Sequence, residues 1–134
     1  MRAPARPPPP LRLRVAGAPL ADRLAGVRRE VASWAEGHGL DEMLVEDLVL
    51  ATHEALANVA DHAYPDGAGE AWLDVECTAD GVDVAVRDHG TWRTPAADTG
   101  WRGRGLIIIR GLADEVRVIP DRAGTTVRMR WRFD

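Results

Sequence analysis

The pattern of apolar and polar positions divides the first half of the chain into one strand and two helices. Residues 11–15 alternate apolar and polar side chains, which predicts a short strand with one buried face. Over residues 20–34, apolar side chains recur at spacings of three and four, which predicts an amphipathic helix that ends near Gly37. Residues 41–62 repeat the helical spacing, and Asp41 is the expected N-cap of this second helix.

The second half of the chain favours two pairs of strands. Alternation over residues 71–78 and 82–87, on either side of an Ala-Asp-Gly turn, predicts a β-hairpin. Residues 116–119 and 125–133 predict two closing strands, the last of which alternates arginines with apolar residues. We expect its apolar side chains to face the helices and its arginines to face water.

The stretch between these strand pairs is the least regular part of the chain. Residues 91–102 show no periodicity and predict a loop of about 12 residues, a candidate lid. A Gly-Arg-Gly run at 103–105 then precedes Leu-Ile-Ile-Ile at 106–109, where intrinsic propensity favours a strand. We predict a buried helix through Leu112 instead, because glycines that lead into a helix N-terminus form an anion site from free backbone N–H groups and the helix dipole.

Length, composition and charge narrow the class of protein. The chain has 134 residues, of which 46% are hydrophobic, which suits one domain with one core. Residues 1–10 end in four prolines and lack the apolar segment of a secretory signal, so we expect a disordered tail before a single domain at 11–134. No apolar stretch approaches the roughly 20 residues that span a bilayer. The formal net charge of -4 argues against a nucleic-acid binder. Cys77 is the only cysteine, which excludes an internal disulfide and makes a reducing cytoplasm the expected location.

One pair of polar residues on the second predicted helix has the spacing of a chemical site. Glu54 and Asn58 are four residues apart, so their carboxylate and amide share one helix face and can together hold a water molecule and a metal ion. Asn58 is the only asparagine, and the chain contains neither Gln nor Lys, so all 17 of its basic residues are arginine. A buried asparagine bonded to a nearby loop is the alternative for this position.

Two further motifs lie at predicted strand ends. Asp88 ends the hairpin and is followed by Gly90, which lets a planar ligand approach the backbone. A Gly-Thr-Thr run at 124–126 begins the last strand. Taken alone, Asp-x-Gly is a weak signal because ordinary turns use it constantly.

In this order, the four motifs resemble those of the GHKL ATPase superfamily and, within it, the small bacterial anti-sigma-factor serine kinases typified by RsbW and SpoIIAB. The resemblance extends from Pro19 to Phe133. It implies an α/β two-layer sandwich, the Bergerat ATP-binding fold, in which a mixed, mostly antiparallel sheet carries helices on one face.

The resemblance also implies a role for each motif in binding ATP and Mg²⁺. Glu54 would be the catalytic general base, and Asn58 would be the magnesium ligand. Asp88 would accept a hydrogen bond from the adenine amino group, and Gly90 would make room for the ring. The other implied cofactor-binding residues are Gly103, Arg104 and Gly105 at the phosphates, and Thr125 at the Asp88 end of the adenine pocket.

The function that the resemblance implies is that of an ATP-dependent protein serine/threonine kinase in a partner-switching circuit. Such a kinase phosphorylates a serine of an anti-anti-sigma protein with a STAS domain, and it also binds and silences a sigma factor. A homodimer is expected only from the family. Neither direct binding of nucleic acid nor membrane attachment is expected.

The sequence departs from the family pattern in its adenine motif. Trp92 stands where the second glycine of Asp-x-Gly-x-Gly is expected, and the stretch before Gly100 is poor in glycine for a lid. Three alternatives therefore stay open: a catalytically weak or inactive module that regulates by docking partners, the catalytic domain of a histidine kinase acting in trans, and an unrelated α/β domain with coincidental glycines. The retained Glu54 favours the kinase, whereas Trp92 favours the docking module.

Overall fold

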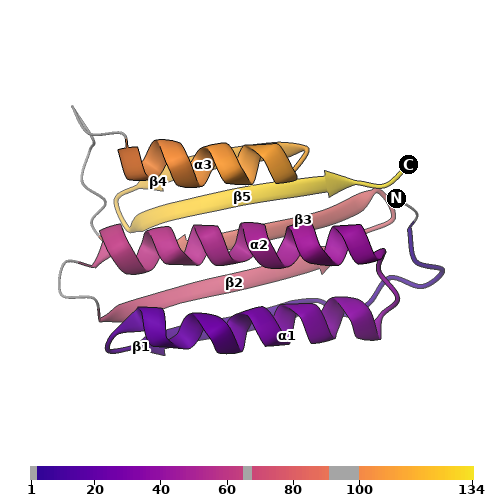
Figure 1. Ribbon diagram of the computed structural model, residues 1–134, viewed down its shortest axis with the longest axis horizontal. Helices are drawn as coiled ribbons and strands as arrows, with labels where there is room; N and C mark the ends of the chain where they lie inside the picture. The colour runs from indigo at the N-terminus through magenta and orange to yellow at the C-terminus, as the bar shows by residue number, and fades with distance from the viewer. Residues whose placement is uncertain (1–2, 65–67, 91–99) are drawn as a thin grey trace.

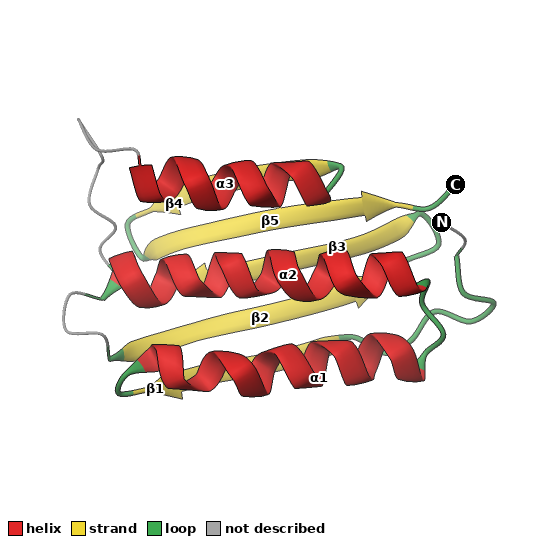
Figure 2. Cartoon of the chain, viewed as in Figure 1, coloured by secondary structure: helices red, strands yellow, loops and turns green. Residues whose placement is uncertain are grey.

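Three α-helices lie side by side on one face of a five-stranded sheet in the described part of the protein (Figure 1, Figure 2). The computed structural model describes residues 3–64, 68–90 and 100–134, with side chains in the last range from Gly105 onward. The strands are β1 (Leu11–Gly17), β2 (Gly69–Cys77), β3 (Gly81–Asp88), β4 (Glu115–Asp121) and β5 (Gly124–Arg132). The helices are α1 (Leu24–Gly37), α2 (Glu42–Asn58) and α3 (Gly100–Leu112).

Short turns of other helix types extend two of these helices. A 3-10 turn, Leu20–Arg23, leads into α1, so the first turn of the predicted helix is wound more tightly than the rest. A π-helical turn, Val59–Ala63, continues α2 to the predicted end of that helix. The predicted N-cap of α2 is confirmed, because Asp41 Oδ1 accepts a hydrogen bond of 2.9 Å from the Met43 N–H.

The strand order is β1-β2-β3-β5-β4, and each of the four pairings is antiparallel. The predicted two-layer sandwich is therefore confirmed, but the described sheet is antiparallel throughout instead of mixed. The reason lies in the crossover from β3 to β4, which runs through α3 and leaves a space that β5 fills. β4 is thus parallel to β3 without being its neighbour.

The hydrophobic core lies between the helices and the inner face of the sheet. The predicted apolar stripe of the second helix is buried throughout, and so are the inward side chains of β5: Leu44, Leu48, Ala51 and Ala55 on α2, Val59 in the π-helical turn, and Val127, Met129 and Trp131 on the strand. Trp131 also donates a hydrogen bond of 2.8 Å from Nε1 to the Leu112 carbonyl, which ties β5 to the end of α3. The cost of burying the indole N–H is offset by this bond.

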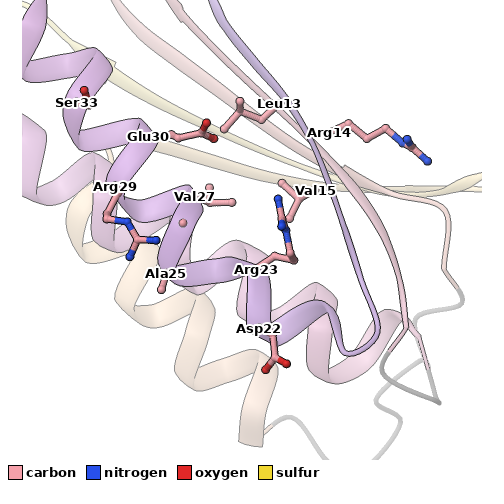
Figure 3. A pocket seen from close by; sticks show the side chains of 11 residues that line it. Leu13, Arg14, Val15, Asp22, Arg23, Ala25, Val27, Arg29, Glu30 and Ser33 are labelled. Carbon is pink, nitrogen blue, oxygen red and sulfur yellow. The ribbon is translucent and has the colours of Figure 1, made fainter.

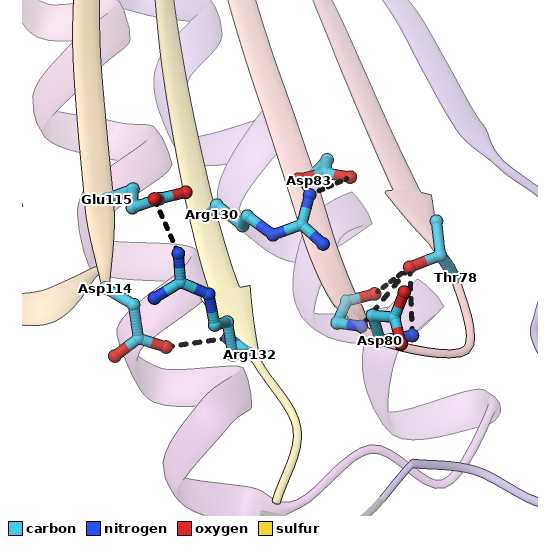
Figure 4. Close-up of polar contacts among 8 residues, drawn as sticks. Thr78, Asp80, Asp83, Asp114, Glu115, Arg130 and Arg132 are labelled. Atoms are coloured by element: carbon cyan, nitrogen blue, oxygen red, sulfur yellow. Dashed lines mark hydrogen bonds and ion pairs between the residues drawn. The ribbon is translucent and has the colours of Figure 1, made fainter.

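The arginines of β5 face away from the helices, as predicted, and two of them pair with carboxylates of neighbouring strands (Figure 4). Arg130 lies 3.2 Å from Asp83 of β3, and Arg132 lies 2.5 Å from Glu115 of β4. Because these pairs are largely solvated, they contribute little to stability, about 0–1 kcal/mol each. They do fix complementary charges across three adjacent strands.

The predicted helix over residues 106–112 is confirmed even though local propensity favours a strand. Ile109 is completely buried, whereas Ile107 is 70% exposed, so the isoleucine run does not behave as a buried strand. Packing of α3 against α2 overrides the propensity of the β-branched residues. The loop predicted over residues 91–102 ends earlier than expected, because α3 already begins at Gly100. The rest of the candidate lid, residues 91–99, lies outside the described residues.

The end of the proline run lies against α1. Pro8 is buried, and the Pro9 carbonyl accepts a hydrogen bond of 2.8 Å from Trp34 Nε1. The division of the chain into a tail at 1–10 and a domain at 11–134 stays a prediction. Both ends of the chain lie at the same side of the sandwich (Figure 1). Among the helices in the described ranges, none has both the length and the apolar character of a membrane span.

The cap of α2 yields a stability prediction. We expect Asp41→Ala to lower the free energy of unfolding by about 1 kcal/mol, because the Met43 N–H loses its acceptor. Urea denaturation followed by circular dichroism measures this change. The matched control is Glu46→Ala, which removes an exposed carboxylate from the second turn of the same helix and is expected to change the free energy by less than about 0.5 kcal/mol. Equal losses in both variants would contradict a capping role for Asp41.

Candidate functional site

The four sequence motifs converge at one end of the sandwich, opposite the chain termini (Figure 1). The C-terminal end of α2, the N-terminal end of α3, the last residue of β3 and the first residues of β5 all lie there. This convergence follows from the topology, because β3 and β5 are antiparallel neighbours and α3 starts where β3 has ended. Residues that are far apart in the chain therefore surround one space.

α2 supplies the pair that the sequence analysis singled out. Asn58 is only 7% exposed, and Glu54, one turn earlier, is half-buried. No described residue forms a hydrogen bond with the Asn58 side chain, so the alternative of an asparagine bonded to a nearby loop is not found in the described residues. A largely buried side chain whose amide has no described partner is available to a bound ligand.

α3 rests directly on this amide. A Cβ atom at Gly105 would lie 2.8 Å from Asn58 Nδ2 and 3.0 Å from Asn58 Oδ1, closer than a side chain tolerates. Glycine at this position thus lets the backbone of α3 approach the polar end of Asn58. Such close backbone approach is one of the main uses of glycine at ligand sites.

The Gly-Arg-Gly run is placed differently from the prediction. It was expected to precede the helix, but α3 begins at Gly100, so Gly103 and Gly105 lie in its first two turns. Since only the first four N–H groups of a helix lack an internal partner, the Gly105 N–H is not one of the free donors of α3. The contribution that the structure gives Gly105 is therefore steric. The side chain of Arg104 lies outside what is described.

Asp88 occupies the end of β3 as a buried carboxylate, with 1% of its surface exposed. Its Oδ1 accepts a hydrogen bond of 2.9 Å from the Gly90 N–H, and its register partner is Thr125, which is 4% exposed. Gly124 has a φ of +145°, and a Cβ there would lie 1.9 Å from the Asp88 carbonyl oxygen. The start of β5 therefore holds Asp88 through a contact that only glycine permits.

Gly90 also has a packing role that the sequence did not predict. That it leaves room for a planar ring stays a prediction, while a Cβ at Gly90 would meet the Ala63 carbonyl oxygen at 2.1 Å. The position that a Gly90 side chain would take is thus filled by the backbone at the end of the π-helical turn. Trp92, the residue that departs from the family motif, lies outside the described residues.

One residue of this region was missed by the sequence analysis. Tyr64 follows the π-helical turn, and its hydroxyl contacts the backbone of both Glu70 and His89. In the sequence, Tyr64 precedes a proline, and its only signal is that it is the single tyrosine of the chain.

A metal ion at this end would depend on few protein ligands. The described ranges contain no group of three or more His, Cys, Asp or Glu side chains arranged to hold a metal. The carbonyl oxygen of Asn58 is a suitable ligand for Mg²⁺, which usually takes one or two protein ligands and completes its shell with phosphate and water. The donor set fits a metal that arrives with a phosphate ligand.

A cleft of about 720 Å³ lies elsewhere, between β1 and α1 (Figure 3). Its lining includes Arg14, Arg23 and Arg29 together with Asp22 and Glu30, so residues of both charges surround it. It contains none of the predicted site residues. We therefore place the candidate site at the convergence of the motifs and not in this cleft.

Comparison with known proteins agrees with the fold. The chain is 27% identical over 124 residues to the serine-protein kinase RsbW of Bacillus cereus (strain ATCC 10987 / NRS 248), an alignment that covers 81% of this chain and 77% of the relative. The RsbW of Bacillus mycoides (strain KBAB4) is similar to the same extent. The crystal structure of the RsbU and RsbW domains of Rv1364c from Mycobacterium tuberculosis shares the fold, with a TM-score of 0.72 and 24% identity.

That alignment covers 92% of this chain and 32% of the mycobacterial chain, so the protein corresponds to about a third of that polypeptide. Residues 18–131 match the family of histidine kinase-like ATPase domains. The match begins after β1 and includes all three α-helices, the strands β2, β3 and β4, and β5 up to its next-to-last residue. The chain therefore belongs to the family of histidine kinase-like ATPase domains.

Proposed function

We propose that this protein is an ATP- and magnesium-dependent protein serine kinase that also acts as an anti-sigma factor in partner switching. The observation that carries the proposal is the position of Asn58, a residue that is 7% exposed, has no described partner for its amide, and lies one turn after Glu54 and against Gly105 of α3. A carboxylate, an amide and the first turns of a helix thus meet at one point. Membership of the ATPase family and the similarity to proteins named serine-protein kinase RsbW support the same assignment.

Each group at this point has a task in phosphoryl transfer. Bound Mg·ATP supplies the phosphoryl group, and its metal neutralises charge on the phosphates. Asn58 would contribute its carbonyl oxygen to the metal, while Glu54 would accept the proton of the attacking serine hydroxyl. The N-terminal turns of α3, with Gly103, Arg104 and Gly105, would lie along the phosphates. Phosphoryl transfer requires mainly positioning and charge stabilisation from the protein, and this arrangement supplies both.

The buried Asp88 carboxylate would recognise the base. A carboxylate accepts hydrogen bonds only, so it pairs with the adenine amino group and disfavours a carbonyl oxygen at the same place. Thr125, its buried neighbour on β5, would support this end of the pocket. Because Asp88 is held by the Gly90 N–H and by Gly124, it is preorganised for such recognition.

The partners follow from the relatives and the family resemblance. We propose a serine of a STAS-domain anti-anti-sigma protein as the phosphoryl acceptor and a sigma factor as the protein that is silenced. A cytoplasmic location and a homodimer belong to the same proposal. No direct binding of nucleic acid is proposed, because the net charge is -4.

Calorimetric titration with ATP tests the proposal at its central residue. We expect wild-type protein to bind ATP in the presence of Mg²⁺, and Asn58→Ala to weaken that binding roughly 10- to 100-fold through loss of a ligand to a charged group. Wild-type protein titrated with EDTA present is the control, and its affinity is expected to fall towards that of the variant. No binding by wild type at millimolar ATP would refute the kinase proposal and leave a module that acts by docking partners.

Glu54 separates binding from chemistry. We expect Glu54→Gln to keep ATP affinity within about twofold and to slow phosphoryl transfer at least about 100-fold, because the amide cannot accept the serine proton. Transfer to a purified STAS-domain protein, detected by intact mass, measures the rate. Full activity in Glu54→Gln would rule out Glu54 as the general base.

Gly105 connects the packing of α3 to the site. We expect Gly105→Ala to weaken Mg·ATP binding by about tenfold, since its Cβ would displace the Asn58 amide. The matched control is Gly111→Ala in the same helix, where a Cβ would meet nothing within 4 Å. That variant is expected to raise stability by roughly 0.5–1 kcal/mol and to bind normally. Normal nucleotide affinity in Gly105→Ala would show that the contact with Asn58 has no part in binding.

A further inference from the structure

The Tyr64 side chain links two backbone segments at the site end of the sheet. Its hydroxyl donates a hydrogen bond of 2.5 Å to the Glu70 carbonyl oxygen and accepts one of 3.1 Å from the His89 N–H. A tyrosine hydroxyl has one proton to donate and can accept as well, so both of these bonds are compatible with a single orientation. Tyr64 itself is half-buried at the exit of the π-helical turn.

The Tyr64 hydroxyl lies just beyond the last paired residues of β2 and β3. The last paired residues of β2 and β3 are Ala71 and Asp88. Glu70 and His89 are the next step of the same register, and there the Tyr64 hydroxyl lies between the two backbone groups. The side chain therefore continues the connection between the strands by one step beyond the ladder, immediately after Asp88.

The surrounding backbone leaves the ring and the turn little freedom. A Cβ at Gly69 would lie 2.2 Å from Cδ2 of the Tyr64 ring, so the ring packs flush against β2 where a side chain cannot fit. On the other side, Gly90 lies against the Ala63 carbonyl, the residue just before Tyr64. Residues 63–64, 69–70 and 88–90 are thus packed together through backbone contacts and one hydroxyl.

This packing acts on the Asp88 carboxylate through its neighbours. The His89 N–H donates a hydrogen bond to the Tyr64 hydroxyl. The N–H of the next residue, Gly90, donates a hydrogen bond to Asp88 Oδ1. The orientation of that carboxylate depends on where the backbone at 89–90 lies. We propose that Tyr64 is a positioning residue that aims the Asp88 carboxylate and so determines the preference of the site for adenine. The inference rests on the proposed function, in which Asp88 recognises the adenine amino group.

The test compares ATP with inosine triphosphate, in which a carbonyl replaces the adenine amino group. Calorimetry in the presence of Mg²⁺ gives the Kd of each nucleotide for wild type and for Tyr64→Phe, which keeps the ring and removes both hydrogen bonds. We expect the variant to bind ATP about three- to tenfold more weakly and inosine triphosphate within about twofold of wild type. The preference for ATP therefore shrinks, which a general loss of folded protein would not cause.

A matched control removes a hydroxyl from the other end of the same two strands. Thr78 Oγ1 accepts hydrogen bonds of 3.2 Å from the Asp80 and Gly81 N–H groups in the β2–β3 turn (Figure 4). Thr78→Val is expected to lower stability without changing the ratio of the two affinities. Gly69→Ala provides a second variant at the site end, since its Cβ would displace the Tyr64 ring, and it is expected to reduce the ATP preference as Tyr64→Phe does.

The outcomes distinguish the inference from the proposed function. If wild type binds ATP with a clear preference and Tyr64→Phe keeps that preference, the positioning role is refuted and the kinase proposal stands. An equal loss of affinity for both nucleotides in Tyr64→Phe would also refute it, because the hydroxyl would then support the site as a whole. If wild type binds neither nucleotide, the proposed function and this inference are both overturned.

Discussion

The approach of α3 to α2 at Gly105 and Asn58 is the constraint on which the rest of the site depends. The two helices come so close there that a methyl group on Gly105 would lie 2.8 Å from the Asn58 amide nitrogen. Since α3 forms the crossover between β3 and β4, this approach also sets where its first turns lie relative to the end of β3. Helix packing and site geometry are therefore determined by the same contact.

The distribution of buried polar side chains reflects this arrangement. Among the described residues, the buried polar side chains are Thr52, Asn58, Asp88 and Thr125, and all but Thr52 lie at the site end of the sandwich. Burying polar groups is unfavourable unless they find partners, so a protein selected for stability alone has little reason to gather them there. The rest of the core is apolar, which lets α2 and the sheet support this polar end.

The sequence predicts those parts of the fold that depend on local pattern. Alternation identified the strands because one face of the sheet is buried and the other is solvated. The stripe on α2 was predictable for the same reason, while α3 was predicted from its glycines against the propensity of its isoleucines. The spacing of Glu54 and Asn58 indicated a shared face because four residues make one helical turn.

What escaped prediction depends on contacts between distant residues. The insertion of β5 between β3 and β4, the start of α3 at Gly100 and the packing of Gly90 against Ala63 follow from tertiary packing. The bridge from Tyr64 to His89 spans 25 positions and exists only in one strand register, which no local pattern encodes. Residues of this kind are recognisable only once the backbone is placed.

The location of the two chain ends has a consequence for the architecture of larger proteins. Both ends lie at the side of the sandwich away from the converging motifs, and Trp34 holds the incoming segment through the Pro9 carbonyl. A polypeptide joined to either end would begin on the side opposite the edge where the motifs converge. The edge formed by the ends of α2 and β3 and the starts of α3 and β5 would then lie clear of the point of attachment.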